Sequence, residues 1–336
     1  MSSLSDSSDI AQLRAGRVGD EPIVTAHAVD GYGPVFNAGV LYHDGCYHLF
    51  ARAVREGYRR NLADGPRFLD YVSDIVVFTS ADGHTYEWGY VLAAARDGVY
   101  AYEDPRVQWV RSDGEPHLVM TYTRIEDPAL GRPWRIGAHL LRYADGRFHL
   151  DERSATLLGP DGVPNKDAVV FNLADGRVAM IHRIHPDAQL AVFDSIEHLW
   201  SPDARYWDRY LAALGDHVVL VPGRDATGVG AGAPPVEIAE GLLLLFHERE
   251  RSGRYTAKVA LLDPATGRVR SHIDEPVLVP ELSWELVGDV DHVVFPQGAH
   301  VRPDDTLYFT YGAADRCVGA ATISLPQMRD HFGRVA

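Results

Sequence analysis

Hydrophobic positions along the chain fall in short runs that alternate with turn-forming residues. Examples are GVLYHDGCYHLFARA (39–53), VVFTSADGHTYEW (76–88), AVVFNLADGRVAMIHR (168–183) and GLLLLFHERE (241–250), all rich in β-branched and aromatic residues. Such runs are typical of β-strands. The dipeptide Asp-Gly occurs nine times, and it favours hairpins because both central residues of a type I′ turn need positive φ. The pattern therefore predicts an all-β chain built from hairpins.

Helix-like periodicity is weak by comparison. The best candidates are DRYLAALGDH (208–217) and LPQMRDHF (325–332), and both are short. We expect the second to form a short C-terminal helix within residues 325–336.

The hairpins recur at a nearly constant interval. One acidic turn residue marks each repeat, and successive markers are separated by 69, 62, 65 and 64 residues. The markers are Asp44, Asp113, Asp175, Glu240 and Asp304. A second strand pair fits between neighbouring markers, so each repeat supplies about four strands, the content of one propeller blade. A β-sandwich has similar strands but gives no reason for five near-equal periods. We therefore predict a five-bladed β-propeller, forming a single domain over residues 1–336 with an N-terminal extension at 1–20.

Matching positions of the five hairpins share one end of the predicted central channel. Residues about eight before and eight after a turn lie opposite each other, at the end of the hairpin away from the turn. The upstream positions are Asn37, Asp104, Lys166, Ala231 and Phe295, and the downstream positions are Arg52, Tyr122, Arg183, Glu248 and Gly312. Charged residues are frequent in this set, although buried charge is costly without a partner. This end of the channel is therefore the predicted functional site.

Motifs around these positions occur in a characteristic order along nearly the whole chain. They are VFNAG (35–39), FARA (50–53), YEDPRV (102–107), MTYTR (120–124), NKDAVVF (165–171), IHRIHPD (181–187), GAGAPP (230–235), LLLFH (243–247), VVFPQGA (293–299) and YGAAD (311–315). Together they resemble glycoside hydrolase family 130, which contains β-mannoside phosphorylases and related mannosidases. The resemblance implies a five-bladed propeller that cleaves a β-linked mannoside with inversion, with inorganic phosphate as co-substrate and α-mannose 1-phosphate as product.

The resemblance assigns the general acid to Asp104. An inverting glycosidase needs one protonated carboxyl that donates to the leaving oxygen, and in this family the proton is thought to pass through a sugar hydroxyl. The sequence has a second Glu-Asp-Pro tripeptide, containing Asp127, in a loop pattern outside the repeat. The position in the repeat, rather than the tripeptide, therefore selects Asp104.

The resemblance also assigns the binding residues. Phosphate arrives already nucleophilic and anionic, so its site needs positive charge instead of a second carboxylate. The residues expected at the phosphate are Arg124, Lys166, Arg183, His185 and His247. The residues expected at the mannosyl subsite are Asn37, Arg52, Arg106, Asp167, Tyr311 and Asp315. No metal and no cofactor other than phosphate is expected.

Departures from the family pattern keep other functions open. Glu248 follows His247 where a glycine is usual, and Gly228 stands where many members have a basic residue. A carboxylate beside phosphate would repel it, and Glu248 or another carboxylate could instead activate water in an inverting β-mannosidase. A non-catalytic sugar-binding propeller is a third alternative. The linkage, β-1,2 or β-1,4, is left open.

Charge and composition limit the classes of molecule that the protein is expected to bind. The formal net charge of −15 disfavours nucleic acid and anionic membranes, because both would be repelled. The start, MSSLSDSSDI, lacks the features of a signal peptide, and no apolar run reaches the ~18 residues of a membrane span. We expect a cytoplasmic protein that binds manno-oligosaccharide and phosphate. The basic and aromatic segment 55–71 is predicted to be a substrate lid or a self-association surface of a homo-oligomer.

Overall fold

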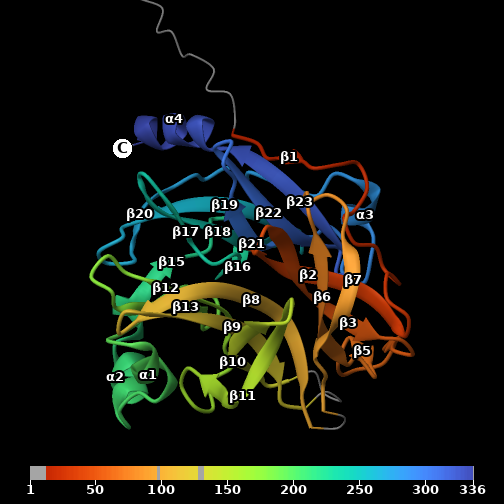
Figure 1. Cartoon of the computed structure of the whole chain (residues 1–336), viewed down its shortest axis with the longest axis horizontal. Helices are drawn as coiled ribbons and strands as arrows, with labels where there is room; N and C mark the ends of the chain where they lie inside the picture. The colour runs from red at the N-terminus through yellow and green to blue at the C-terminus, as the bar shows by residue number, and fades with distance from the viewer. Residues whose placement is uncertain (1–12, 97–98, 128–131, 336) are drawn as a thin grey trace, which may run out of the picture.

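The strands of the protein form five antiparallel sheets arranged in a ring (Figure 1). The computed structural model describes residues 13–96, 99–127 and 132–335. Four of the sheets have four strands and one has five, and a separate ribbon has two. The predicted five-bladed β-propeller is therefore confirmed.

The first three sheets follow one another along the chain. The first is formed by β2 (Tyr32–His43), β3 (Cys46–Arg55), β6 (Ser73–Ser80) and β7 (Glu87–Ala93). The second is formed by β8 (Ala101–Ser112), β9 (Glu115–Ile125), β10 (Trp134–Ala144) and β11 (Arg147–Leu158). The third is formed by β12 (Lys166–Asn172), β13 (Val178–Arg183), β14 (Ala188–Phe193) and β15 (Val218–Leu220).

The remaining sheets complete the ring. The fourth is formed by β16 (Ala226–Ala231), β17 (Val236–Ile238), β18 (Gly241–Glu250), β19 (Tyr255–Leu262) and β20 (Val269–His272). The fifth is formed by β21 (Val294–Val301), β22 (Thr306–Ala313), β23 (Cys317–Ser324) and β1 (Gly16–Arg17). The small ribbon pairs β4 (Arg59–Arg60) with β5 (Phe68–Leu69).

The N-terminal strand closes the ring. Gly16 and Arg17 of β1 pair with Thr322 and Ala321 of β23, so the red start of the chain runs beside its blue end in Figure 1. The guanidinium of Arg17 donates to both carboxylate oxygens of the fully buried Glu285, each at 2.7 Å. Residues 1–12 of the predicted N-terminal extension lie outside the described residues, whereas 16–17 belong to the fifth sheet.

Apolar clusters fill the spaces between neighbouring sheets. Within the described residues there are five such clusters, and each joins two consecutive sheets around the ring. One example packs Phe50 and Ile75 of the first sheet against Val107 and Met120 of the second. The last cluster joins Leu49 of the first sheet to Tyr308 of the fifth. Each blade thus buries its faces against its two neighbours, as the repeat predicted.

Turn chemistry explains the repeated hairpins. Asp44 and Gly45 have φ of 51° and 77°, and Asp113 and Gly114 have φ of 51° and 81°. Positive φ at both central residues is the type I′ geometry that Asp-Gly favours. These turns fix the register of the inner hairpins β2–β3 and β8–β9.

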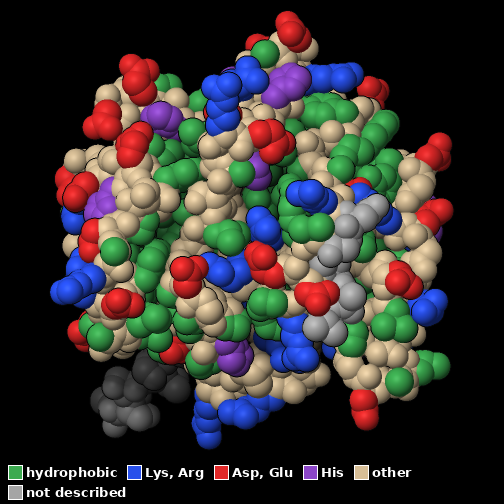
Figure 2. Space-filling model, turned by 90° about the horizontal axis from the view of Figure 1, so that it is seen from below, with side chains coloured by type: hydrophobic (Ala, Val, Ile, Leu, Met, Phe, Trp, Pro, Cys, Tyr) green, Lys and Arg blue, Asp and Glu red, His purple; other side chains and the backbone are tan. Residues whose placement is uncertain are grey.

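Helices lie at the periphery of the ring (Figure 1). They are α1 (Ile196–Trp200), α2 (Tyr206–Ala212), a 3₁₀ turn (Leu214–His217), α3 (Ser283–Leu286) and α4 (Leu325–Val335). The helix α4 coincides with the predicted C-terminal helix. No helix of the described residues has the length and apolar character needed to cross a membrane. On the face shown in Figure 2, acidic and basic side chains are interspersed among apolar ones.

The innermost strands carry β-bulges at matching positions. The register shifts at Asn37 in β2, at Asp104 in β8 and at Asp167 in β12, and these residues have φ of 45°, 51° and 56°. Asn and Asp tolerate this left-handed conformation better than other residues with a β-carbon. Bulges redirect side chains and are frequent near active sites. Three blades therefore use the same device near the central axis.

Candidate active site

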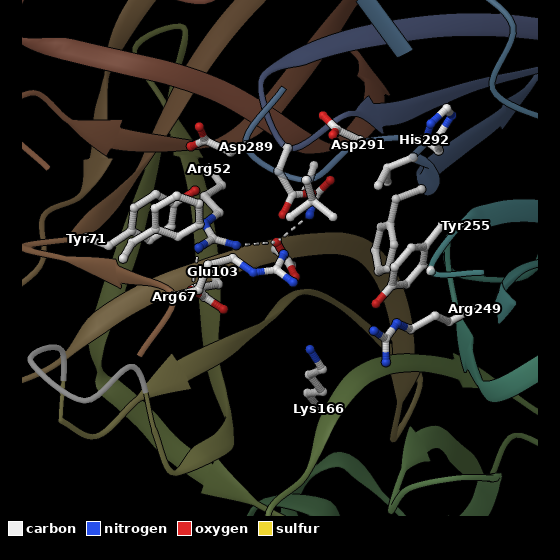
Figure 3. A pocket seen from close by; sticks show the side chains of 18 of the residues that line it. Arg52, Arg67, Tyr71, Glu103, Lys166, Arg249, Tyr255, Asp289, Asp291 and His292 are labelled. Carbon is white, nitrogen blue, oxygen red and sulfur yellow. Dashed lines mark hydrogen bonds and ion pairs between the residues drawn. The ribbon is translucent and has the colours of Figure 1, made fainter. Parts of the chain in front are cut away.

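A cavity of about 1170 Å³ opens where the inner strands end (Figure 3). Four of the five innermost strands contribute to its lining, with Asn37, Glu103 and Asp104, Lys166, and Phe295. Outer strands and connecting segments supply the rest, including the 55–71 segment and the residues before β21. The end of the channel selected by the repeat is thus the site of this cavity.

Asp104 is held by neighbours from the first sheet. The Nδ2 atom of Asn37 donates to Oδ1 of Asp104 at 2.8 Å, and Nη1 of Arg52 lies 3.4 Å from the same oxygen. The other amino group of Arg52 forms a close ion pair with Glu103. Asp104 is only 5% exposed yet lines the cavity. Its carboxyl group is therefore fixed in orientation and still accessible to a ligand.

Lys166 is a cation without a carboxylate partner. Among the described residues it forms no ion pair, and its ammonium group lies 5.1 Å from the centre of the Trp134 ring. Burial, and after it the charge of Arg183, lowers the pKa of Lys166. Because Lys166 lines the cavity, an anionic ligand would supply the missing negative charge.

A layer of paired charges lies behind Lys166. Asp167 is fully buried, with Nε of Arg183 at 3.0 Å, Nη2 of Arg106 at 3.4 Å and Nε2 of His247 at 3.6 Å from its carboxylate. Burial alone would raise the pKa of Asp167, but the surrounding cations, Arg183 first among them, hold it well below its usual value. Burial lowers the pKa of His247 to about 3, so this imidazole is neutral at pH 7.

Gly230 makes room for this layer. A β-carbon at Gly230 would lie 2.5 Å from Oδ2 of Asp167 and 2.7 Å from Cε1 of His247. The first glycine of the GAGAPP stretch is therefore required because the side chains of Asp167 and His247 approach its backbone closely.

Asp315 adds a carboxyl group with an unusual pKa. Burial, opposed by the charge of Arg52 and assisted by the negative charges of Asp104 and Glu103, raises the pKa of Asp315 to about 7. Burial also raises the pKa of Glu103. Asp315 therefore retains its proton to higher pH than an ordinary aspartate.

Comparison with known proteins places the chain in a family. The sequence profile Glyco_hydro_130, described as β-1,4-mannooligosaccharide phosphorylase, matches residues 7–332. The chain belongs to glycoside hydrolase family 130. The predicted family is thus confirmed, and with it the assignment to an enzyme family of glycoside phosphorylases.

Two relatives cover almost the whole chain. It is 27% identical over 328 residues to a 1,2-β-oligomannan phosphorylase of Thermoanaerobacter sp. (strain X514), covering 94% of this chain and 99% of the relative. It is 29% identical over 313 residues to a β-1,2-mannobiose phosphorylase of the same organism, covering 88% and 91%. A solved β-1,2-mannobiose phosphorylase from Listeria innocua, in complex with β-1,2-mannobiose, has a TM-score of 0.70 at 22% identity and covers 94% and 98%. It supports the propeller fold.

All twelve predicted site residues of this family 130 protein lie in the described part of the chain. They fall into three groups by position. Five line the cavity: Asn37, Arg52, Asp104, Lys166 and Asp315. Four lie in the buried layer behind it: Arg106, Asp167, Arg183 and His247. Three lie away from it: Arg124, His185 and Tyr311.

The three distant residues have other partners. Nε of Arg124 lies 3.0 Å from Glu126, and its guanidinium stacks over the Tyr100 ring at 4.3 Å. The hydroxyl of the fully buried Tyr311 donates to Glu285 at 2.8 Å. The exposed His185 ring packs over Gly228. The assignment of Arg124 and His185 to phosphate and of Tyr311 to the sugar stays a prediction.

Arg106 also has other partners. Its guanidinium donates to the carbonyl oxygens of Gly232 at 2.7 Å and Ala231 at 3.1 Å, in addition to its contact with Asp167. These bonds join the inner strand of the second sheet to the fourth sheet. Arg106 is buried and is not among the cavity-lining residues, so in this arrangement it holds the strands and Asp167 in place, and its contact with the sugar stays a prediction.

Sequence reasoning missed the aromatic residues of the cavity. Tyr71, Trp134 and Tyr255 line it, but they lie outside the inner hairpins. Trp134 and Tyr255 begin β10 and β19, the third strands of their blades, at the end that faces the cavity. The basic and aromatic composition of the 55–71 segment was the available signal for Tyr71.

Replacing Asp315 with asparagine is expected to stabilise the protein more at pH 8 than at pH 5. The folded pKa of about 7 exceeds the value of roughly 3.9 for an unfolded aspartate. The folded state therefore binds the extra proton between these values, and stability falls as the pH rises from about 4 to 7. Asparagine removes this ionisation and tolerates the φ of 51°. Thermal unfolding at both pH values measures the gain. Asp113→Asn, in an exposed turn, is the control, and an equal gain at both pH values would contradict the assignment.

Proposed function

We propose that the protein catalyses inverting phosphorolysis of a β-linked manno-oligosaccharide and releases α-mannose 1-phosphate. A phosphate oxygen forms a bond to the anomeric carbon as the bond from that carbon to the glycosidic oxygen breaks. The leaving oxygen keeps the electron pair and receives the proton supplied by Asp104, through a sugar hydroxyl as the family resemblance implies. The observation that supports this proposal best is that Asp104 and the unpaired Lys166 line the same cavity.

The basic residues supply a place for phosphate. Lys166 faces the cavity, and Arg183 lies behind it, anchored by Asp167. Phosphate would complete the charge balance of Lys166 at the end of the channel. Asn37, Arg52 and Asp315 offer polar groups to the mannosyl hydroxyls from the opposite sheets.

Glu248 does not support the hydrolytic alternative. Its carboxylate lies 2.7 Å from Nζ of Lys258 and accepts a hydrogen bond from the backbone of Gly223 at 2.9 Å. Glu248 is not among the residues that line the cavity, whereas Glu250 of the same strand is. These contacts disfavour Glu248 as the base of the hydrolytic alternative and leave another cavity carboxylate as its candidate.

Initial rates at increasing phosphate test the proposal. The two relatives at 27% and 29% identity are named for β-1,2-linked substrates, so β-1,2-mannobiose is the first substrate and β-1,4-mannobiose the second. We expect cleavage of at least one to require phosphate and to saturate with it. Equal rates with and without phosphate would reject phosphorolysis in favour of hydrolysis.

Lys166→Met is expected to raise the KM for phosphate by at least ~10-fold, because it removes a charge-assisted contact and leaves the apolar stem. The KM for mannobiose should change less. Steady-state kinetics with each substrate varied in turn separate the two values. Lys258→Met, which removes a lysine paired with Glu248 off the cavity, is the control. A Lys166→Met enzyme with the parental KM for phosphate would remove Lys166 from the phosphate site.

A further inference from the structure

The Arg52 guanidinium is held between two aromatic rings. Its central carbon lies 4.8 Å from the centre of the Phe36 ring and 5.3 Å from the centre of the Tyr71 ring. The Arg52 side chain is only 8% exposed. A guanidinium stacked on aromatic faces keeps its donors free for carboxylates in the plane of the group. Here those carboxylates are Glu103 and Asp104.

Tyr71 belongs to a segment that crosses the rim of the cavity. Its ring stacks on Phe68 at 4.7 Å and meets the edge of Tyr58 at 4.9 Å. The Tyr58 hydroxyl donates to the carboxylate of Asp289 at 2.7 Å, and Arg60 donates to the Asp289 carbonyl at 3.0 Å. Asp289 lies on the connection that precedes β21. The segment 55–71 is thus fastened at both sides of the opening.

We propose that Tyr71 is a positioning residue for the general acid, because its ring holds Arg52 against Asp104 and Glu103. Figure 3 shows Tyr71 beside Arg52, with Glu103 below them and Asp289 above. A chain of contacts therefore runs from Asp289 through Tyr58 and Tyr71 to Arg52. The inference rests on the proposed function, since it concerns the proton that Asp104 supplies.

The charge of Arg52 sets the direction of the expected effect. The other charged groups that act on Glu103, Asp104 and Asp315 are Arg52, Arg106, Lys166, Asp167 and Asp289. A nearby positive charge favours carboxylate ions and lowers their pKa. Loosening Arg52 therefore weakens the positive charge that favours the ionised carboxyls, and the alkaline limb of the rate profile, where the required proton is lost, moves to higher pH.

The test compares Tyr71→Leu and Tyr71→Phe in phosphorolysis of mannobiose from pH 5 to 9. We expect Tyr71→Leu to lower kcat by about 10-fold and to shift the alkaline limb upward, with a smaller change in the KM for phosphate. Tyr71→Phe, which keeps the ring, should restore both values. Tyr58→Phe removes the bond to Asp289 and should shift the limb in the same direction by less, even if Tyr71→Leu folds poorly.

Tyr90→Leu is the matched control. It removes a ring that lies 5.2 Å from the Arg147 guanidinium, remote from the cavity, so it should lower stability without moving the limb. The positioning role would be overturned if Tyr71→Leu kept the parental kcat and alkaline limb. It would also be overturned if the limb moved equally in Tyr90→Leu. Either result would leave the proposed function intact. A parent enzyme that cleaves no mannoside with phosphate would instead reject the proposed function itself.

Discussion

Replacing Asp104 with asparagine is expected to lower kcat for phosphorolysis by roughly 10³-fold. Asparagine cannot supply the proton that the leaving oxygen needs. It should leave the structure intact, because it adopts the left-handed conformation of the bulge, where φ is 51°. Its amide oxygen can still accept the hydrogen bond from Asn37. Mannobiose binding, measured by calorimetry, should therefore stay within a few-fold of the parent.

The second Glu-Asp-Pro tripeptide supplies the control for this prediction. Asp127→Asn makes the same change in a loop outside the cavity lining, so its kcat should match the parent. An Asp104→Asn enzyme that keeps more than a tenth of the parental kcat would remove Asp104 from the role of acid.

Replacing Glu285 with glutamine is expected to lower the free energy of unfolding by about 3 kcal/mol. Glu285 accepts two bonds from Arg17, one from the Tyr311 hydroxyl and two from the backbone of Glu281 and Leu282. A glutamine amide presents a donor to some of these donors and leaves Arg17 with only the exposed Glu281 as a counter-charge. Because Arg17 lies on the strand that closes the ring, the loss should weaken the closure. Urea unfolding measures it.

Glu281→Gln is the matched control, since Glu281 pairs with the same arginine at 3.0 Å but its side chain is 57% exposed. An exposed ion pair contributes less than about 1 kcal/mol. Equal losses in the two variants would show that the buried carboxylate does not hold the closing strand.

The sequence predicted the fold well because the hairpins carry local signals. Asp-Gly turns fix the register of β2–β3 and β8–β9, and the near-equal spacing of the markers reports five units that pack on one another. Counting from the turns also brought Asn37, Asp104 and Lys166 to one cavity. These predictions depend on strand geometry alone, which repeats from blade to blade.

Side-chain direction was harder to predict. In a strand, neighbouring residues point to opposite faces, so a bulge or a shift of one residue reverses the assignment. Glu248 is at a predicted channel position but pairs with Lys258 off the cavity, while the adjacent His247 faces the axis. Arg106 and Asp167 form an ion pair behind the cavity. This pair joins separate blades, so spacing along the chain does not reveal it. Tyr71 reaches the site from a segment outside the repeat, so no spacing rule could locate it.

The central claim is that a single cavity holds both phosphate and Asp104, the source of the proton for the leaving group. The identity of the first product tests this claim most directly. The parent enzyme would be mixed with β-1,2-mannobiose and phosphate, and the reaction followed by proton and phosphorus NMR. The account predicts α-mannose 1-phosphate as the first product, with one phosphate consumed for each bond cleaved and no free mannose from the donor ring. Free mannose released from that ring at the same rate without phosphate, or a β-configured phosphate ester, would contradict it.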